Sequence, residues 1–292
     1  MINKNNQGLK REISIVIPAY NEEKRIGGTL QDYLGYYKNL GKDFEIIVVL
    51  NGCCDRTEEI VDSFLKQYPS HVKKEVFHAP IGKGGALIEG VSKARGKIIA
   101  HTDADGATLP QELHKLIQII ETKQADLVIG SRWIEGATVI PKQPLKRRIA
   151  SRCYNFLVRC LFNLPFKDTQ YPAKAISKDV LSKIQNGLHI ADMSFDINLI
   201  FSVLKNKKKI KEIPIYWQDK EGSKVKLVKT SLLMFRSLIR LRMIYSPLRF
   251  LVPYLQIIAE PVRKKLSGWP TSDYRVIRNL LIDNPKTLKI RK

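Results

Sequence analysis

The chain has 292 residues, 44% of them hydrophobic, and its 50 Lys and Arg against 28 Asp and Glu give a formal net charge of +22. This length and apolar content suit a globular protein that buries one large core, or one domain with an appendage. The charge implies an anionic partner: nucleic acid, membrane lipid or a phosphorylated substrate. No apolar run is long enough to cross a bilayer, which argues against a spanning helix.

The first 130 residues alternate between short apolar runs and longer amphipathic segments. The apolar runs predict buried strands, because they are short, partly β-branched and closed by turn residues. They are Ile13–Ile17, Phe44–Leu50, Ile98–Thr102 and Ala125–Gly130, and the more polar stretch Lys73–Phe77 is predicted as a further strand. Helices are predicted between these strands. The first ends near Leu40, the second covers Asp55–Tyr68, the third runs from the Gly82 loop to about Ala94, and the fourth begins at Pro110. This alternation predicts a mostly parallel central sheet flanked by helices.

Polar side chains follow each of these predicted strands. They are Asn21 and Glu22, Asn51 and Asp55, Lys83, and Asp103 and Asp105. Because the carboxyl ends of parallel strands share one edge of the sheet, we expect these side chains to meet there. The arrangement favours a nucleotide site over unrelated turns.

Two acids stand one residue apart directly after the Ile98–Thr102 run. They are Asp103 and Asp105, and Gly106 follows them. Two close carboxylates repel each other unless a cation lies between them, and oxygen ligands of this kind suit Mg²⁺ or Mn²⁺ with a bound phosphate. The alternative is a solvated Asp-x-Asp-Gly turn.

Five motifs resemble, in order and spacing, those of family 2 glycosyltransferases with the GT-A fold. They are Ser14-Ile-Val-Ile-Pro-Ala-Tyr-Asn-Glu-Glu23, Asn51-Gly-Cys-Cys-Asp-Arg-Thr57, Gly82-Lys-Gly-Gly-Ala86, Asp103-Ala-Asp-Gly106 and Gly130-Ser-Arg-Trp133. A narrower set resembles the dolichyl-phosphate glucosyltransferase and polyprenyl-phosphate glycosyltransferase branch. It comprises Asp168-Thr-Gln-Tyr-Pro-Ala-Lys174, Phe195-Asp196, Ile213-Pro-Ile-Tyr-Trp217 and Gly222-Ser-Lys224. The resemblance implies an enzyme that transfers a sugar from a nucleotide donor.

The resemblance also implies roles on the nucleoside side of the site. Pro18, Tyr20 and Glu22 would border the uridine, with Glu22 near the ribose. Asn51 stands where many relatives have an Asp that accepts the base N–H, and its carbonyl oxygen can accept as well. Asp55 would close the base pocket, or would instead cap the following helix. The Asn in place of Asp leaves the identity of the base open.

On the diphosphate side, the resemblance implies a metal site with basic neighbours. Asp103 would contact the ribose or reach the metal through water, and Asp105 would bind the metal. The ion would bridge the diphosphate and offset the charge that grows on the leaving group. Lys83 would approach the nucleotide or sugar, with a solvated loop lysine as the alternative. Arg132 would contact the diphosphate, or form a structural ion pair.

Asp168 is implied to lie near the acceptor. Family 2 enzymes invert, so an acceptor oxygen attacks C1 from the far side, and a hydroxyl acceptor needs a carboxylate to take its proton. A phosphate monoester has a second pKa of about 6 and is largely a dianion at neutral pH, so it has less need of a base. Asp168 is therefore either a base or a group that positions the acceptor or a basic neighbour. Tyr171-Pro172 departs from the Cys-Gly pair that is common in this motif.

The C-terminal third is basic and apolar. No acid occurs between Gly222 and Ala259. In residues 228–245 one predicted helical face carries Val228, Leu232, Phe235, Ile239 and Met243, and Lys229, Arg236 and Arg240 lie towards another. This pattern predicts an interfacial helix, apolar into lipid and basic towards anionic headgroups. The alternative is a helix packed on the sheet with a solvated basic face. Lys224 is the candidate contact for an acceptor phosphate, or a surface lysine.

We expect four parts: a polar tail over 1–11, a GT-A catalytic domain over 12–226, amphipathic membrane-associating helices over 227–260 and a basic tail over 261–292. Residues 1–11 lack an apolar core, so no signal peptide is expected. Cys53, Cys54, Cys153 and Cys160 show no metal-binding spacing and are interpreted as reduced thiols of a cytoplasmic protein.

The leading hypothesis is metal-dependent transfer of a hexose, with glucose favoured, from a UDP-sugar to a polyprenyl or dolichyl phosphate. The enzyme would lie peripherally on the cytoplasmic face of a membrane, bound to anionic lipid. One alternative keeps the donor site and uses a glycan or a small soluble hydroxyl acceptor. The other is a basic nucleic-acid-binding protein, against which the absence of any recognisable nucleic-acid motif argues.

Overall fold

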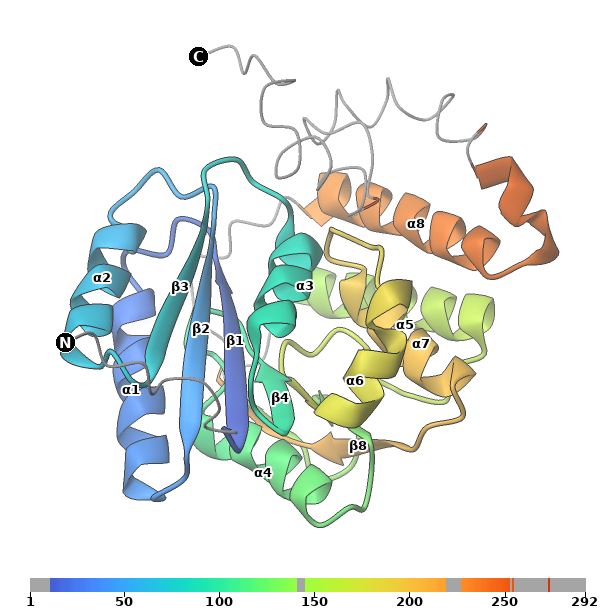
Figure 1. The fold of residues 1–292 in the computed structure, drawn as a ribbon. Coiled ribbons are helices and arrows are strands. Elements are labelled where there is room, and N and C mark those ends of the chain that lie inside the picture. Colours follow the sequence, from blue (N-terminus) through green and yellow to red (C-terminus); the bar gives the residue numbers. More distant parts are fainter. Residues whose placement is uncertain (1–10, 141–144, 219–226, 253, 255–272, 274–292) are drawn as a thin grey trace.

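The computed structural model describes residues 11–140, 145–218, 227–252, 254 and 273 (Figure 1). A seven-stranded sheet forms its centre, in the order β3-β2-β1-β4-β7-β5-β8. The strands are β1 (Ile13–Ala19), β2 (Phe44–Asn51), β3 (Val72–Phe77), β4 (Ile98–His101), β5 (Leu127–Ser131), β7 (Lys174–Ser177) and β8 (Ile210–Pro214). All pair in parallel except β7, which runs antiparallel to β4 and β5. A small second sheet pairs β6 (Thr138–Ile140) with β9 (Tyr216–Gln218).

Helices cover both faces of the large sheet (Figure 1). They are α1 (Ile26–Asn39), α2 (Thr57–Gln67), α3 (Lys83–Lys93), α4 (Pro110–Glu121), α5 (Leu145–Phe162), α6 (Lys178–Ile184), α7 (Phe195–Lys205) and α8 (Leu227–Ile244), with 3-10 turns η1 (Gln185–Gly187) and η2 (Pro247–Leu251). Helices α1, α2 and α4 pack on one face, and α3, α5, α6, α7 and α8 belong to the core on the other.

The two faces follow from the alternation of side chains along the strands. In β1, Ile15 and Ile17 enter the core beneath α1 and α4, while Val16 enters the core beneath α3 and α7. In β2 all eight residues are buried, because both of its faces are covered. Such strands are almost continuously apolar, which is why the sequence identifies them.

The predicted strands and helices of residues 13–131 are confirmed to within a few residues. Strand β7 was not predicted. It is four residues long and begins with a buried Lys174, so neither its length nor its pattern marks a strand. Because β7 lies between β4 and β5, the set of neighbouring parallel strands β3-β2-β1-β4 ends at β4.

Helix α8 has an inner and an outer side. Leu238 and Leu241 are fully buried in the core shared with α5, whereas Leu232, Phe235 and Ile239 are 47%, 40% and 37% exposed. The apolar face predicted from the sequence is thus the outward one. The expectation of a basic face turned towards solvent or headgroups is wrong for Arg240, whose guanidinium forms an ion pair with Asp273 and whose side chain is 11% exposed.

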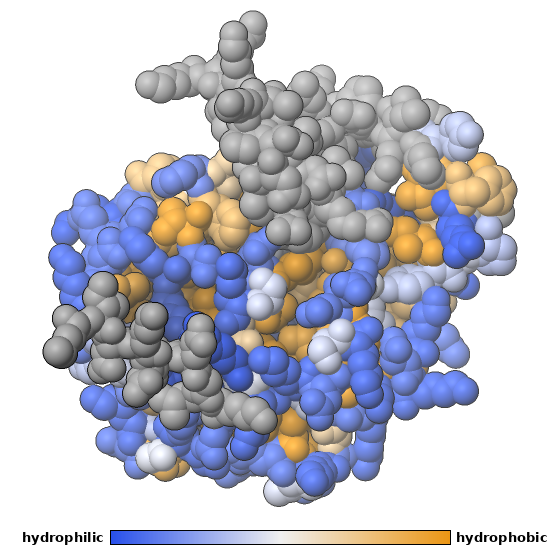
Figure 2. All heavy atoms as spheres, viewed as in Figure 1, coloured by the Kyte–Doolittle hydropathy of each residue, from blue (hydrophilic) through white to orange (hydrophobic). Residues whose placement is uncertain are grey.

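Apolar side chains gather at the surface near the α8–η2 end of the molecule, at the upper right of Figure 2. Across the described ranges, no helix combines the length and apolarity that a bilayer span requires.

Candidate active site

The loops that follow β1 and β2 are joined by hydrogen bonds at the carboxyl edge of the sheet. The Cys54 N–H donates to Asn21 Oδ1 at 2.8 Å, and the Glu22 N–H donates to Thr57 Oγ1 at 2.7 Å. Asp55 accepts from the Thr57 N–H at 3.0 Å and from the Glu23 N–H at 3.2 Å. Asp55 therefore bonds the first N–H of α2 and ties the two loops together, although the residue at the cap position of α2 is Arg56, and the choice between cap and base pocket for Asp55 stays a prediction.

The side chains expected around the nucleoside lie along these loops, with different surroundings. Pro18 is half-buried near the end of β1, and Tyr20 is 48% exposed. The Glu22 carboxylate accepts two hydrogen bonds from the Arg25 guanidinium, at 2.6 and 2.7 Å. Asn51 is buried at the end of β2, and its carbonyl oxygen accepts from the Ile81 N–H at 2.7 Å. That oxygen has a second lone pair, so it remains able to accept from a ligand.

The two acids after β4 lie beside a lysine from another element. Lys83 opens α3, and its Nζ is 2.6 Å from Asp103 Oδ1. Asp105 Oδ1 accepts from the Ala107 N–H at 3.0 Å. Burial, and then the charge of Asp103, raise the pKa of the Asp105 carboxyl. Burial alone would lower the pKa of Lys83, but the carboxylates of Asp103 and Asp196 outweigh it and raise that pKa.

This carboxylate pair suits a divalent ion only in combination with a ligand. Within the part of the chain that the structure describes, no group of three or more His, Cys, Asp or Glu side chains is placed to hold a metal. Asp103 and Asp105 would therefore supply the protein ligands, and phosphate oxygens and water would supply the rest, which is how Mg²⁺ is commonly held. Two carboxylates one residue apart offer the oxygen donors that Mg²⁺ and Mn²⁺ prefer, and burial and the charge of Asp103 together raise the pKa of Asp105, so the residues fit a cation.

A second ion pair lies buried behind Lys83, and the sequence analysis assigned it no role. Lys174 of β7 is fully buried, with its Nζ 2.7 Å from Asp196 Oδ1 and 2.6 Å from the Tyr171 carbonyl oxygen. Burial lowers the pKa of Lys174, although Asp196 opposes the shift. A lysine between the apolar Ala173 and Ala175 is the signal that marks this position in the sequence.

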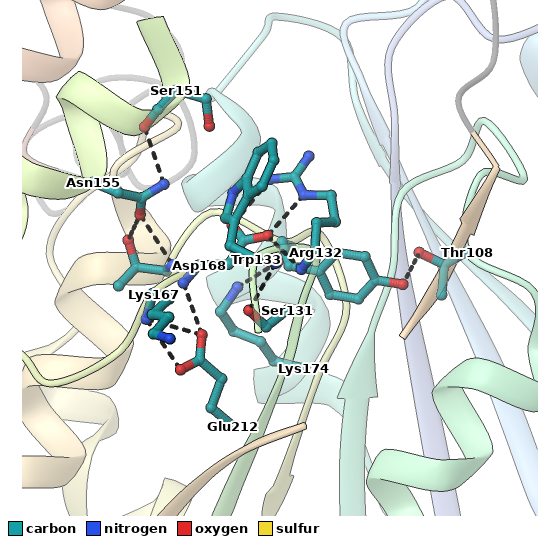
Figure 3. Close-up of polar contacts among 12 residues, drawn as sticks. Thr108, Ser131, Arg132, Trp133, Ser151, Asn155, Lys167, Asp168, Lys174 and Glu212 are labelled. Carbon is teal, nitrogen blue, oxygen red and sulfur yellow. Dashed lines mark hydrogen bonds and ion pairs between the residues drawn. The ribbon is translucent and has the colours of Figure 1, made fainter. Parts of the chain in front are cut away.

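Asp168 and Arg132 form an ion pair in which both carboxylate oxygens accept hydrogen bonds (Figure 3). Asp168 Oδ2 accepts from the backbone N–H of Arg132 at 3.0 Å and from its Nε at 2.7 Å, and Oδ1 accepts from Nη2 at 3.0 Å. The Asp168 side chain is 0% exposed. The guanidinium carbon lies 5.5–5.9 Å from the ring centres of Trp133, Tyr171 and Trp217. The structure shows the ion pair that the sequence offers as the alternative for Arg132, while the choice between base and positioning group for Asp168 stays a prediction.

The segment that carries Asp168 is held from two sides (Figure 3). Glu212 of β8 accepts from the Asp168 N–H at 2.8 Å and from the Lys167 N–H at 3.0 Å. Asn155 of α5 accepts from the Thr169 N–H at 3.1 Å and from its hydroxyl at 2.8 Å. Neither Glu212 nor Asn155 was predicted as a site residue, because their partners are distant in sequence. Lys224, the expected acceptor-phosphate contact, lies outside the described residues.

Comparison with known proteins decides the family. Residues 14–185 match the family model described as Glycosyl transferase family 2. The chain belongs to this family. It is 32% identical over 249 residues to the dolichyl-phosphate beta-glucosyltransferase of Saccharomyces cerevisiae, covering 80% of this chain and 75% of that protein. It is 30% identical over 246 residues to the enzyme of the same name from Homo sapiens, covering 80% and 76%.

The fold of this family 2 glycosyltransferase is that of a known structure. Glucosyl-3-phosphoglycerate synthase from Mycobacterium tuberculosis, in complex with Mn²⁺, uridine diphosphate and phosphoglyceric acid, superposes with a TM-score of 0.61. The match has 20% sequence identity and covers 81% of this chain and 80% of that one. The predicted GT-A fold and the prediction of a sugar-transferring enzyme are confirmed.

Proposed function

We propose that this glycosyltransferase transfers glucose from UDP-glucose to a polyprenyl phosphate, with inversion at the anomeric carbon and with a divalent metal. The observation that carries the proposal is the likeness, over 80% of the chain, to enzymes named dolichyl-phosphate beta-glucosyltransferase. The assignment of a nucleotide-sugar donor is supported by the carboxyl edge of the central sheet, where Asp103, Asp105 and Lys83 lie together.

On the donor side, Asp105 and Asp103 would hold Mg²⁺ or Mn²⁺ against the diphosphate. When bound, the ion supplies positive charge that stabilises the leaving nucleoside diphosphate. Lys83, at the start of α3, and Arg132, after β5, would add two further positive charges from the protein. Pro18, Tyr20 and Asn51 would border the base, since they end the neighbouring strands β1 and β2. Glu22 would approach the ribose while it stays paired with Arg25.

On the acceptor side, the pairing of Asp168 supports a phosphate acceptor. Both Asp168 oxygens already accept hydrogen bonds from Arg132. A carboxylate whose two oxygens both accept from one guanidinium is engaged in holding that arginine. A phosphate monoester is largely a dianion at neutral pH and attacks without losing a proton. Asp168 would then orient Arg132 towards the phosphates, and Lys224 would add an acceptor contact.

A lipid acceptor requires that the enzyme reach a membrane, and two neighbouring helices supply a suitable surface. No acid occurs between Glu135 and Asp168, the stretch that forms α5, nor between Gly222 and Ala259, the stretch that contains α8. These two helices share one apolar core. Most of the largest exposed apolar side chains of the described residues lie on them and on η2: Ile149, Phe156, Leu232, Phe235, Ile239 and Phe250.

Apolar side chains among basic ones, without acids, match the chemistry of an anionic lipid surface. We therefore place the outer faces of α5 and α8 against the bilayer. With a cytoplasmic nucleotide-sugar donor, this makes the enzyme peripheral on the cytoplasmic side of a membrane.

The deciding experiment is transfer of labelled glucose from UDP-glucose to polyprenyl phosphate in detergent or vesicles, followed by solvent extraction. We expect label in the organic phase, lost with EDTA and in the Asp105→Ala variant. A parallel GDP-sugar reaction tests the base. Metal-dependent UDP release with a soluble hydroxyl acceptor, but no lipid product, would reject the lipid acceptor and leave the donor site standing.

A further inference from the structure

Lys83 occupies the position of a cation at the carboxylate pair. Its ammonium is 2.6 Å from Asp103 Oδ1, and its side chain is 19% exposed. Asp105 lies two residues further on, and Lys83 partly offsets its charge. A lysine ammonium is a compact point charge that takes the place of a metal ion beside a carboxylate without needing a fixed geometry.

The backbone that carries Lys83 is held in place on both sides. Gly82 has a φ of 82°, and a Cβ built on it would lie 2.2 Å from the Ala191 carbonyl oxygen. A Cβ on Gly84 would lie 2.2 Å from the Ile190 carbonyl oxygen. The start of α3 therefore packs closely against residues 190–191, and the Gly85 N–H donates to the Ala191 carbonyl oxygen at 3.1 Å. We expect the side chain of Lys83, rather than this packed backbone, to withdraw from the acids.

Two carboxylates act on Lys83. Asp103 contacts it directly, whereas Asp196 has a nearer cation in the buried Lys174, 2.7 Å away. Asp196 attracts Lys83 but is already neutralised by Lys174. The strongest anchor for Lys83 is therefore Asp103, one of the two carboxylates that would hold a metal.

We propose that Lys83 blocks divalent metal binding at Asp103 and Asp105 until a diphosphate draws its ammonium away. The diphosphate is a better partner for Lys83 than one carboxylate, because it carries more negative charge and more acceptor oxygens. Once Lys83 turns to it, Asp103 is left for the metal, and the phosphate oxygens complete the coordination. Metal and nucleotide then bind as a unit, and metal alone binds weakly. The diphosphate step rests on the proposed function, whereas the competition between Lys83 and metal does not.

The test is a titration of the full-length protein with Mn²⁺ alone, with free Mn²⁺ followed by electron paramagnetic resonance. Removing a positive charge a few ångströms from a divalent ion should tighten Mn²⁺ binding at least about tenfold in Lys83→Gln. Lys83→Arg keeps the charge and should bind Mn²⁺ as weakly as the unmodified protein. Lys93→Gln, an exposed position at the other end of α3, is the matched control and should change nothing.

A second titration adds uridine diphosphate. In the unmodified protein we expect the nucleotide to tighten Mn²⁺ binding, by a larger factor than in Lys83→Gln. If Lys83→Gln and the unmodified protein bind Mn²⁺ with equal affinity in the absence of nucleotide, the proposal that Lys83 blocks metal binding is wrong. If uridine diphosphate has no effect on either protein while Lys83→Gln still binds Mn²⁺ more tightly, the proposed donor fails and the competition stands. Melting curves of all variants confirm that each one is folded.

Discussion

The carboxylate of Asp168 binds both the backbone N–H and the guanidinium of Arg132, across 36 positions of sequence. The acid is fully buried, and the guanidinium is surrounded by three aromatic rings. An arginine held in this way keeps its charge and its direction. The pair therefore fixes the guanidinium at the end of β5, which β7 separates from β4 and its two acids.

Replacement of Asp168 by Asn should remove the charge that holds Arg132. Loss of one partner from a buried ion pair costs about 3–5 kcal/mol, and we expect the unfolding free energy to fall by an amount in the lower part of that range, since the Asn oxygen still accepts one hydrogen bond. Urea denaturation measures this loss.

Turnover separates positioning from base catalysis at Asp168. If Asp168 only positions Arg132, Arg132→Gln and the double variant should lose as much activity as Asp168→Asn. A steep fall in activity that is specific to Asp168→Asn, with Arg132→Gln still active, would restore the role of a base.

Asp105 should make the metal-free enzyme less stable at neutral pH. Burial and Asp103 raise its pKa in the folded protein, so the folded state binds the proton more tightly than the unfolded state does. The contribution of Asp105 to the unfolding free energy is therefore fully present below its unfolded pKa of about 3.8. It is lost as the pH rises through the pKa of Asp105 in the folded protein. Asp105→Asn should therefore melt at a higher temperature than the unmodified protein at pH 7 with EDTA, and the difference should shrink in acid. A variant that melts lower at pH 7 contradicts this reasoning.

The sequence predicts strands β1 to β5 and their carboxyl edge well, because the signals for them are local. Apart from β3, which carries Lys73, Lys74 and Glu75, each strand from β1 to β5 is largely an apolar run followed by polar residues. The carboxyl edge of a parallel sheet then brings Lys83 close to Asp103. The 2.6 Å contact between them depends on where α3 begins, which Gly82 and Gly84 set through packing against Ile190 and Ala191. No pattern in the sequence shows that approach.

The acceptor half is less predictable because its contacts join distant segments. The sequence separates Asp168 from Arg132, Glu212 and Asn155, and β7 enters the sheet through pairing with β4 and β5. In α8 the sequence shows an apolar side but not which side the protein covers. Leu238 and Leu241 face the core, and the longer apolar stripe is left outside.

The outer faces of α5 and α8 should bind anionic vesicles through their exposed apolar residues. Phe156 is 68% exposed and Phe235 is 40% exposed, so replacing both with Gln should leave the melting temperature unchanged. Loss of two inserted aromatic rings should weaken vesicle binding about tenfold or more. Vesicle sedimentation measures it, with Leu40→Gln, 39% exposed at the end of α1, as the control.

Charge reversal at Arg240 is a poor test of the same surface, because it would break the ion pair with Asp273 and disturb the fold. Equal sedimentation of the Phe156 and Phe235 double variant and the Leu40 control would mean that this face does not contact lipid.

The buried pair of Lys174 and Asp196 should show strong coupling in a double-mutant cycle. Each single change, Lys174→Met or Asp196→Asn, leaves the other charge buried without its main partner and should cost about 3–5 kcal/mol of unfolding free energy. The double variant removes both charges at once, and should be more stable than either single variant, because no uncompensated charge remains. Urea denaturation of the four proteins gives the coupling energy.

Lys174 also predicts how that coupling depends on pH. Its pKa is lowered by burial, so the folded state binds this proton less tightly than the unfolded state does. Stability from this group therefore rises as pH passes above the folded pKa towards the unfolded value of about 10.4. Lys174→Met should flatten that rise in alkaline solution, whereas an exposed control such as Lys93→Gln should not. Additive single and double changes at neutral pH would mean that the two charges are solvated separately and do not form the buried pair on which the anchoring of Lys83 depends.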